Sequence, residues 1–89
     1  MTPMRWYAYI LKCVDGSFYT GMTNDLKRRV AAHLAGKGAK YTRGRGPVVL
    51  VWKRVVKDRG AALKLEAAIK RLSRPVKAAL VDGKLRKRL

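Results

Sequence analysis

The sequence predicts a small α/β domain of the α+β type, with its elements in the order ββαβαα. Two stretches of β-branched and aromatic residues flank a turn signal near the N-terminus, and apolar residues at helical spacing follow. A chain of 89 residues holds one domain, and an apolar content of 48% is enough for a compact core. We expect this domain over residues 1–82, followed by a basic tail at 83–89.

The first two strands are predicted at residues 6–14 and 18–22, with Asp15-Gly16 between them. An Asp-Gly pair between two apolar runs is the strongest short hairpin signal. Because side chains alternate between the faces of a strand, the length of the turn decides which residues share a face.

The length of the turn decides whether the two tyrosines of the hairpin, Tyr9 and Tyr19, lie on the same face of the sheet. A two-residue turn places them on opposite faces of the sheet. A three-residue turn pairs Val14 with Phe18 and Cys13 with Tyr19, which brings both tyrosines to one face. A shared site for the tyrosines therefore predicts the longer, bulged turn.

The rest of the chain is predicted to alternate helices with one more strand. The expected elements are a helix over 25–35 that stops at Gly36, a third strand over 48–56 buried in its first half, a helix from Asp58 or Gly60 through Leu72, and a short helix over 75–81.

Between the first helix and the third strand, residues 36–47 combine glycines with bases and predict a long loop. Its candidate nucleic-acid-binding residues are Lys37, Lys40, Tyr41, Arg43 and Arg45. The cations suit a phosphate backbone and Tyr41 suits stacking on an unpaired base. A solvated loop without a binding role fits the same composition.

The charge of the chain predicts a polyanionic partner. There are 22 Lys and Arg against 5 Asp and Glu, a formal charge of +17, and the first quarter of the chain is nearly neutral. Nucleic acid fits better than membrane lipid, because no amphipathic helix stands outside the expected core. Solubility or generic RNA affinity is the simpler explanation of the charge.

Several protein classes are excluded by what the sequence lacks. A single cysteine and a single histidine rule out a disulfide framework and a usual zinc site. There is no P-loop, no dinucleotide fingerprint, no signal-peptide pattern and no apolar run of about 20 residues that would span a bilayer. We therefore expect a cytoplasmic protein.

Three polar residues lie beside the apolar stripes of the predicted helices. Glu66, the only glutamate, borders the stripe of the second helix, where it suits either an ion pair with a base or an Mg²⁺ ligand. Arg29 and His33 are four residues apart on one ridge of the first helix. His33 suits either a hydrogen-bonded place at the core edge or, with the Arg29 fork, a phosphate site.

These positions, taken together, resemble the GIY-YIG nuclease domain over roughly residues 5–75, and most closely its small stand-alone bacterial YhbQ-like group. The resemblance is carried by Tyr7-Ala8-Tyr9, Tyr19-Thr20-Gly21, Arg29, His33 and Glu66 in this order and at these intervals. It implies a central three-stranded antiparallel sheet flanked by helices.

The resemblance also implies divalent-metal-dependent hydrolysis of DNA phosphodiesters, in DNA repair or recombination. Tyr9 and Tyr19 would position or deprotonate the attacking water, and Arg29 would stabilise charge on the scissile phosphate. Glu66 would hold one Mg²⁺ or Mn²⁺, and His33 occupies a position oriented toward the water. For a tyrosine to act as a base, we expect its pKa to be lowered by Arg29, other cations and the metal.

Gly21 would allow a close backbone approach at the end of the second strand. Tyr7 replaces the first glycine of the motif, Thr20 replaces an isoleucine, and Met22 replaces a lysine found in some relatives. An asparagine common after the glutamate helix is also missing. The alternative is therefore a weak or inactive nucleic-acid-binding protein on the same scaffold. DNA is the expected partner, RNA is not distinguished from it, and an accessory protein would supply specificity.

Overall fold

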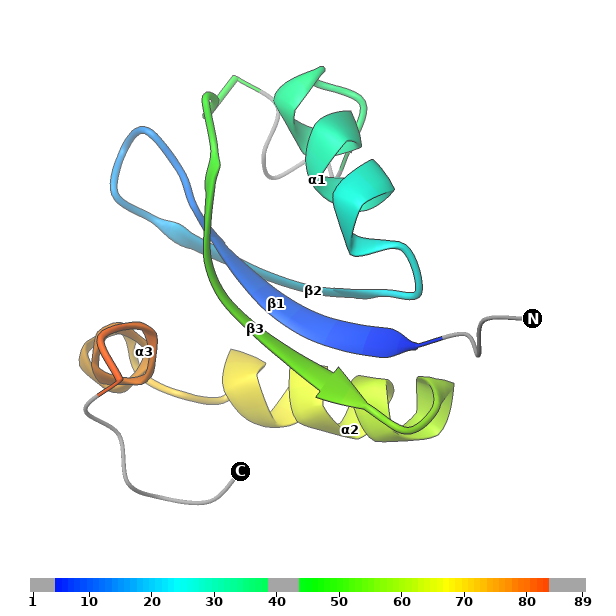
Figure 1. Cartoon of the computed structure of the whole chain (residues 1–89). Coiled ribbons are helices and arrows are strands. Elements are labelled where there is room, and N and C mark those ends of the chain that lie inside the picture. Colours follow the sequence, from blue (N-terminus) through cyan, green and yellow to red (C-terminus); the bar gives the residue numbers. More distant parts are fainter. Residues whose placement is uncertain (1–4, 39–43, 84–89) are drawn as a thin grey trace.

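The computed structural model describes residues 5–38 and 44–83, and Figure 1 shows its elements. They are β1 (Trp6–Lys12), β2 (Phe18–Thr23), α1 (Leu26–Leu34), β3 (Val49–Val56), α2 (Arg59–Lys70) and α3 (Arg74–Val81). The predicted fold class and the order ββαβαα are confirmed.

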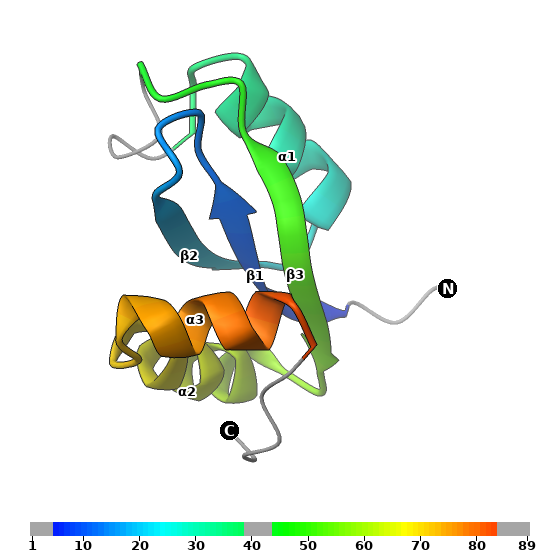
Figure 2. The same ribbon diagram turned by 90° about the vertical axis from the view of Figure 1, so that its left-hand side faces the viewer.

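The three strands form one antiparallel sheet in the order β2-β1-β3 (Figure 2). β1 is central and hydrogen-bonded on both sides, so Ala8 to Leu11 are buried. β3 lies at an edge. The strand predicted over 48–56 was expected to be buried in its first half. Val48 is buried, but Val49 is 59% exposed and residues 50–52 are only half-buried, because β3 has a neighbouring strand on one side only.

The hairpin turn is the longer form, but it lies one residue earlier than predicted. The Cys13 amide donates to the Ser17 carbonyl, and Gly16 has a φ of 84°, the left-handed geometry of a three-residue bulged turn. Tyr19 therefore pairs with Leu11 and not with Cys13, and Phe18 pairs with Lys12 instead of Val14. The partner of Tyr19 on β1 is thus two positions away from the predicted one. Because residues two apart on a strand point to the same face, Tyr9 and Tyr19 still share a face.

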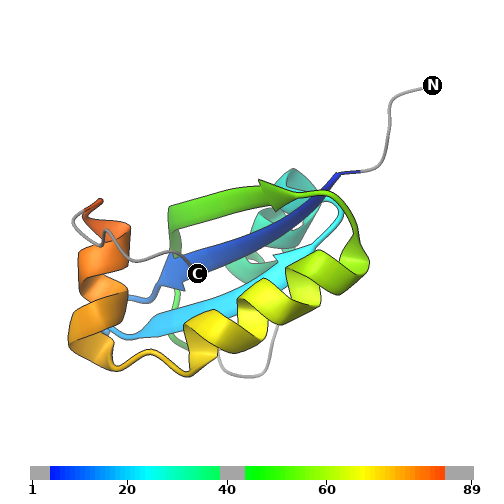
Figure 3. The same ribbon diagram turned by 90° about the horizontal axis from the view of Figure 1, so that it is seen from below.

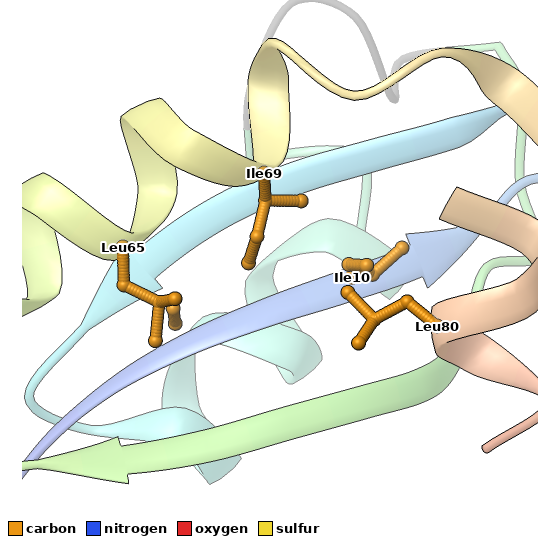
Figure 4. Close-up of a cluster of buried hydrophobic side chains, with 5 residues drawn as sticks. Ile10, Leu65, Ile69 and Leu80 are labelled. Atoms are coloured by element: carbon orange, nitrogen blue, oxygen red, sulfur yellow. The ribbon is translucent and has the colours of Figure 1, made fainter. Parts of the chain in front are cut away.

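Helices cover both faces of the sheet (Figures 1 and 3). α1 lies on one face, while α2 and α3 lie on the other. The α2 and α3 face is closed by side chains from three elements that point toward one another (Figure 4), namely Ile10, Leu65, Ile69 and Leu80 together with Ala8. Thr20 is also buried, and its hydroxyl has no hydrogen-bond partner among residues 5–38 and 44–83.

Local signals in the sequence set the helix ends. The side chains of Asp25 and Asp58 cap α1 and α2 by accepting hydrogen bonds from backbone amides three residues later. Pro75 lies in the first turn of α3, as predicted, whereas α2 ends at Lys70, short of Leu72. Among the described residues, no helix is long and apolar enough to cross a membrane.

Candidate active site

The site is built on the α1 face of the sheet, where Tyr9 lies opposite Gly21 in the β1–β2 pairing. A Cβ atom at position 21 would lie 2.4 Å from Tyr9 Oη and 3.1 Å from Tyr19 Cε2. The ring of Tyr9 thus passes directly over the glycine. The predicted close approach at Gly21 is made by this side chain, and any larger residue would displace the phenol.

Two side chains of α1, the imidazole of His33 and the guanidinium of Arg29, lie against the two tyrosines. His33 is only 1% exposed, and its Nε2 lies 3.1 Å from Tyr9 Oη. The His33 and Tyr19 ring centroids are 5.1 Å apart, and those of Tyr9 and Tyr19 are 6.5 Å apart. Arg29, one turn before His33, hydrogen-bonds both tyrosine side chains. The four predicted catalytic side chains therefore meet at one place.

The protonation states in this cluster follow from burial and charge. Burial, helped by the nearby Arg29 charge, lowers the pKa of His33, so its imidazole is neutral at pH 7. Burial raises the pKa of Tyr9 and keeps its phenol protonated. Because arginine can only donate, Tyr9 Oη accepts from Arg29, and in the tautomer of His33 with an unprotonated Nε2 the phenol donates its own proton to that nitrogen.

Arg29 lowers the pKa of Tyr9 as expected, but the pKa of this phenol is nevertheless raised overall. The hydrogen bond from Arg29 does lower it, but the loss of water around a residue that is 1% exposed is the larger effect. Charges on Tyr19 and Glu66 raise the pKa further. Tyr9 is therefore no base by itself, and it needs an acceptor for its proton.

Glu66 reaches this neighbourhood from the other layer, since α2 packs against β1 and β2 on the opposite face. Its side chain is 18% exposed and forms an ion pair with Lys70 at 3.6 Å. The predicted place beside the apolar stripe is confirmed, because Glu66 directly follows the buried Leu65. The ion-pair alternative thus also has a geometric basis.

The described residues contain no group of three or more His, Cys, Asp and Glu side chains that could hold a metal. Mg²⁺ is often bound by one or two carboxylates and substrate phosphates, without a cage of protein ligands. The partly exposed Glu66 carboxylate fits that mode of binding, in which substrate phosphate oxygens would be the other ligands.

The predicted nucleic-acid-binding loop is described only at its ends. Lys37 is exposed, and Arg45 forms an ion pair with Asp15 of the hairpin turn at 3.3 Å. The loop end is thereby held against the turn, which the sequence did not indicate. Lys40, Tyr41 and Arg43 lie outside the described residues.

Other residues join the site without a signal in the sequence. A Cβ atom at Gly38 would lie 2.3 Å from His33 Nδ1, so the chain after α1 closes over the imidazole. Lys53 is exposed and pairs with Tyr9 across β1 and β3, which places a cation on the tyrosine face. Tyr7, by contrast, was predicted as a motif residue; it lies two residues before Tyr9 on the same face and is partly buried.

Comparison with protein families agrees with this geometry. Residues 5–79 match the model of the GIY-YIG catalytic domain. The chain therefore belongs to the GIY-YIG family, within the nuclease superfamily.

Within that family the chain is similar to small proteins named UPF0213. A UPF0213 protein of Vibrio cholerae serotype O1 is 48% identical over 85 residues, which cover 94% of this chain and 84% of the relative. A UPF0213 protein of Clostridium perfringens is 51% identical over 78 residues, covering 88% of this chain and 84% of the relative.

Solved structures support the same fold. The solution structure of a UPF0213 protein from Bacillus halodurans has a TM-score of 0.59 at 51% identity, covering 91% of this chain and 86% of the other. A solution structure from E. faecalis has a TM-score of 0.61 at 36% identity, covering 99% of this chain and 95% of the other. The three-stranded antiparallel sheet of this chain, with its flanking helices, thus agrees with the sequence prediction.

Proposed function

We propose that this protein is a divalent-metal-dependent endonuclease that hydrolyses DNA phosphodiester bonds and recognises the shape and backbone of its substrate. The observation that carries the proposal is the hydrogen bond between Tyr9 Oη and the neutral His33 Nε2, with Arg29 bonded to the same phenol. This arrangement lets a tyrosine accept one proton while it gives up another.

The proposed reaction begins with a water beside Tyr9. As the water oxygen bonds to phosphorus, its proton moves to Tyr9 Oη, and the phenolic proton moves to His33 Nε2. The bond from phosphorus to the leaving oxygen breaks, and that oxygen takes a proton from solvent. The imidazole supplies the basicity that buried Tyr9 lacks, so a raised tyrosine pKa is compatible with catalysis.

Arg29 would act on the phosphate side of the reaction, while Tyr19, whose ring centroid lies 5.1 Å from that of His33, would help to position the water. The Arg29 guanidinium has five donors, and those not bonded to the tyrosines can bind a phosphoryl oxygen as its charge grows. Glu66 would hold Mg²⁺ or Mn²⁺, whose chemistry is to neutralise charge on the phosphate and on the leaving oxygen.

The substrate would be recognised mainly by its charge. With a formal charge of +17 and no appended recognition domain among the described residues, contacts to phosphates outnumber any contacts to bases. The proposal therefore assigns sequence specificity, where it is needed, to an accessory partner. The cytoplasm is the proposed location.

The experiment uses the full chain with linear, nicked and branched DNA in Mg²⁺ or Mn²⁺. We expect cleavage by the wild type and a rate lower by about 100-fold or more for Tyr9→Phe, the usual scale for loss of a general base. We expect a loss of similar size for Glu66→Gln, which removes the charge that would hold the metal. Asp82→Asn removes a carboxylate at the end of α3, far from the tyrosines in sequence, and is expected to cleave like the wild type. Equal cleavage by the wild type and Glu66→Gln would refute the proposal.

The second candidate function is nucleic-acid binding without cleavage. The Lys70 ammonium already pairs with Glu66, and Met22 stands where some relatives have a lysine. In this case the wild type would bind DNA or RNA in a salt-sensitive manner and cleave neither with any divalent metal.

A further inference from the structure

A polar pocket of about 360 Å³ opens beside the tyrosine cluster, where the end of β2 meets α1. It is lined by Thr23, Asn24, Asp25, Arg28, Arg29 and Ala32. Arg29 belongs both to this pocket and to the tyrosine cluster. A ligand in the pocket and a phosphate at the tyrosines would therefore share one guanidinium.

Most acceptors in the pocket already have partners. Asp25 Oδ1 accepts from the Arg28 amide at 3.2 Å, and Thr23 Oγ1 accepts from the Asp25 amide at 3.1 Å. The Arg28 guanidinium, by contrast, makes no ion pair with any residue in 5–38 or 44–83. With Arg28 and Arg29 against Asp25, the formal charge of the lining is +1, so the pocket favours an anion.

Helix α1 contributes side chains both to the pocket and to the tyrosine cluster, so the two lie side by side. Arg28 and Ala32 form one ridge of α1, and Arg29 and His33 form the next ridge. His33 faces the tyrosines, whereas Ala32 lines the pocket and its small side chain leaves space there. Adjacent ridges on one helix suit groups that repeat along a single chain, as phosphates do in a nucleic acid strand.

We infer that this pocket is a second phosphate subsite, which binds the phosphodiester next to the scissile one on the same strand, with Arg28 as its contact. The assignment of the neighbouring phosphate as the scissile one rests on the proposed function, whereas binding at the subsite does not require cleavage. A water takes about 30 Å³ in the liquid, so a volume of about 360 Å³ admits a phosphodiester with part of its sugar.

The test is an NMR titration of the ¹⁵N-labelled full chain without divalent metal. The ligands are a thymidine dinucleotide with one phosphodiester and a trinucleotide with two. Both should shift the signals of Tyr9, Tyr19 and Arg29, and only the trinucleotide should also shift Asn24 and Arg28. We expect the trinucleotide to bind about tenfold more tightly, the worth of one charge-assisted contact.

Two variants separate a specific contact from general attraction. Arg28→Gln should lose the tenfold gain of the trinucleotide, while Lys27→Gln, an exposed neighbour outside the pocket, should keep it. A neutral methylphosphonate at one of the two linkages should abolish the gain in the wild type and change nothing in Arg28→Gln. The salt slope should differ by about 0.7 between the two ligands in the wild type and by close to zero in Arg28→Gln.

The inference is overturned if Arg28→Gln and Lys27→Gln lose the gain equally, or if the trinucleotide leaves the pocket signals unchanged. These outcomes are independent of catalysis, because no bond is cleaved in the titration. A protein that binds but does not cut DNA would fail the cleavage test and still show the subsite. An active nuclease without the subsite would show the reverse.

Discussion

The two faces of the sheet are covered by different kinds of side chain. Under α2 and α3 the buried cluster is aliphatic, with Ile10, Ile69 and Leu80 at its centre. Under α1 the most deeply buried groups include a phenol and an imidazole, Tyr9 and His33. Burying polar groups costs free energy unless they are hydrogen-bonded, and here the phenol and the imidazole bond to one another.

This difference indicates that one face stabilises the fold and the other holds the chemistry. An aliphatic cluster depends on the volume of its side chains, whereas a polar cluster depends on the pairing of specific atoms. Variants on the two faces should therefore separate stability from the geometry of the site.

The largest effect is expected on the α2 and α3 face. Ile69→Ala removes a fully buried side chain and should lower the free energy of unfolding by about 2–5 kcal/mol, much of the stability of so small a domain. Tyr9→Phe keeps the ring but removes the hydroxyl that contacts His33 and Arg29, so its cost should be about 1–3 kcal/mol. Urea denaturation followed by circular dichroism measures both. Equal losses would show that the two faces are not separable.

A smaller loss of stability is expected at Gly21, where the Tyr9 ring occupies the space that a side chain would need. Gly21→Ala places a methyl group 2.4 Å from Tyr9 Oη, so the phenol must move. We expect a loss of about 1–3 kcal/mol, typical of overpacking, together with a change in the NMR signals of His33.

Gly60→Ala is the matched control for Gly21→Ala. It lies in α2, and its added methyl would meet Asp58 Oδ1 at an ordinary 3.5 Å. Its stability should stay the same or rise by up to about 1 kcal/mol, because alanine favours a helix. Similar losses in both variants would contradict the close-approach role of Gly21.

Local patterns in the sequence were enough for the elements, whereas the set of residues that meet came from the family resemblance. The helix starts were expected near Asp25 and at Asp58 or Gly60, and only the longer of the two turns considered places Tyr9 and Tyr19 on one face, as the structure does. The pairing partner of Tyr19 could not be predicted, because the choice between turns of similar length depends on where a single glycine adopts a positive φ.

Features that depend on contacts between distant segments were not predictable. The raised pKa of Tyr9 follows from how closely α1 covers β1. The closure of Gly38 over His33 involves a loop without a recognisable pattern. The register of the β1–β3 pairing shifts between Ile10 and Leu11, so Val51 is an extra residue in β3. Val51 and Trp52 therefore pack on the same face, although consecutive residues of a regular strand point to opposite faces.

The smallest effect concerns the pH dependence of the polar face. His33 is the only histidine, and burial followed by the Arg29 charge lowers its pKa below the ordinary 6.5. Between the folded and the unfolded pKa, the unfolded chain binds more protons. The contribution of neutral His33 to stability is therefore complete above pH 6.5 and is lost as the pH falls from there to the folded pKa.

Thermal denaturation between pH 5 and pH 7.5 should accordingly show a midpoint that falls on acidification in the wild type. The non-titrating variant His33→Gln should have a flatter profile over this range, because the carboxylates ordinarily titrate near pH 4. Parallel profiles in the two proteins would show that His33 has the same pKa when folded and unfolded. Protonated His33 could no longer accept the Tyr9 proton, so the same acid range should reduce cleavage.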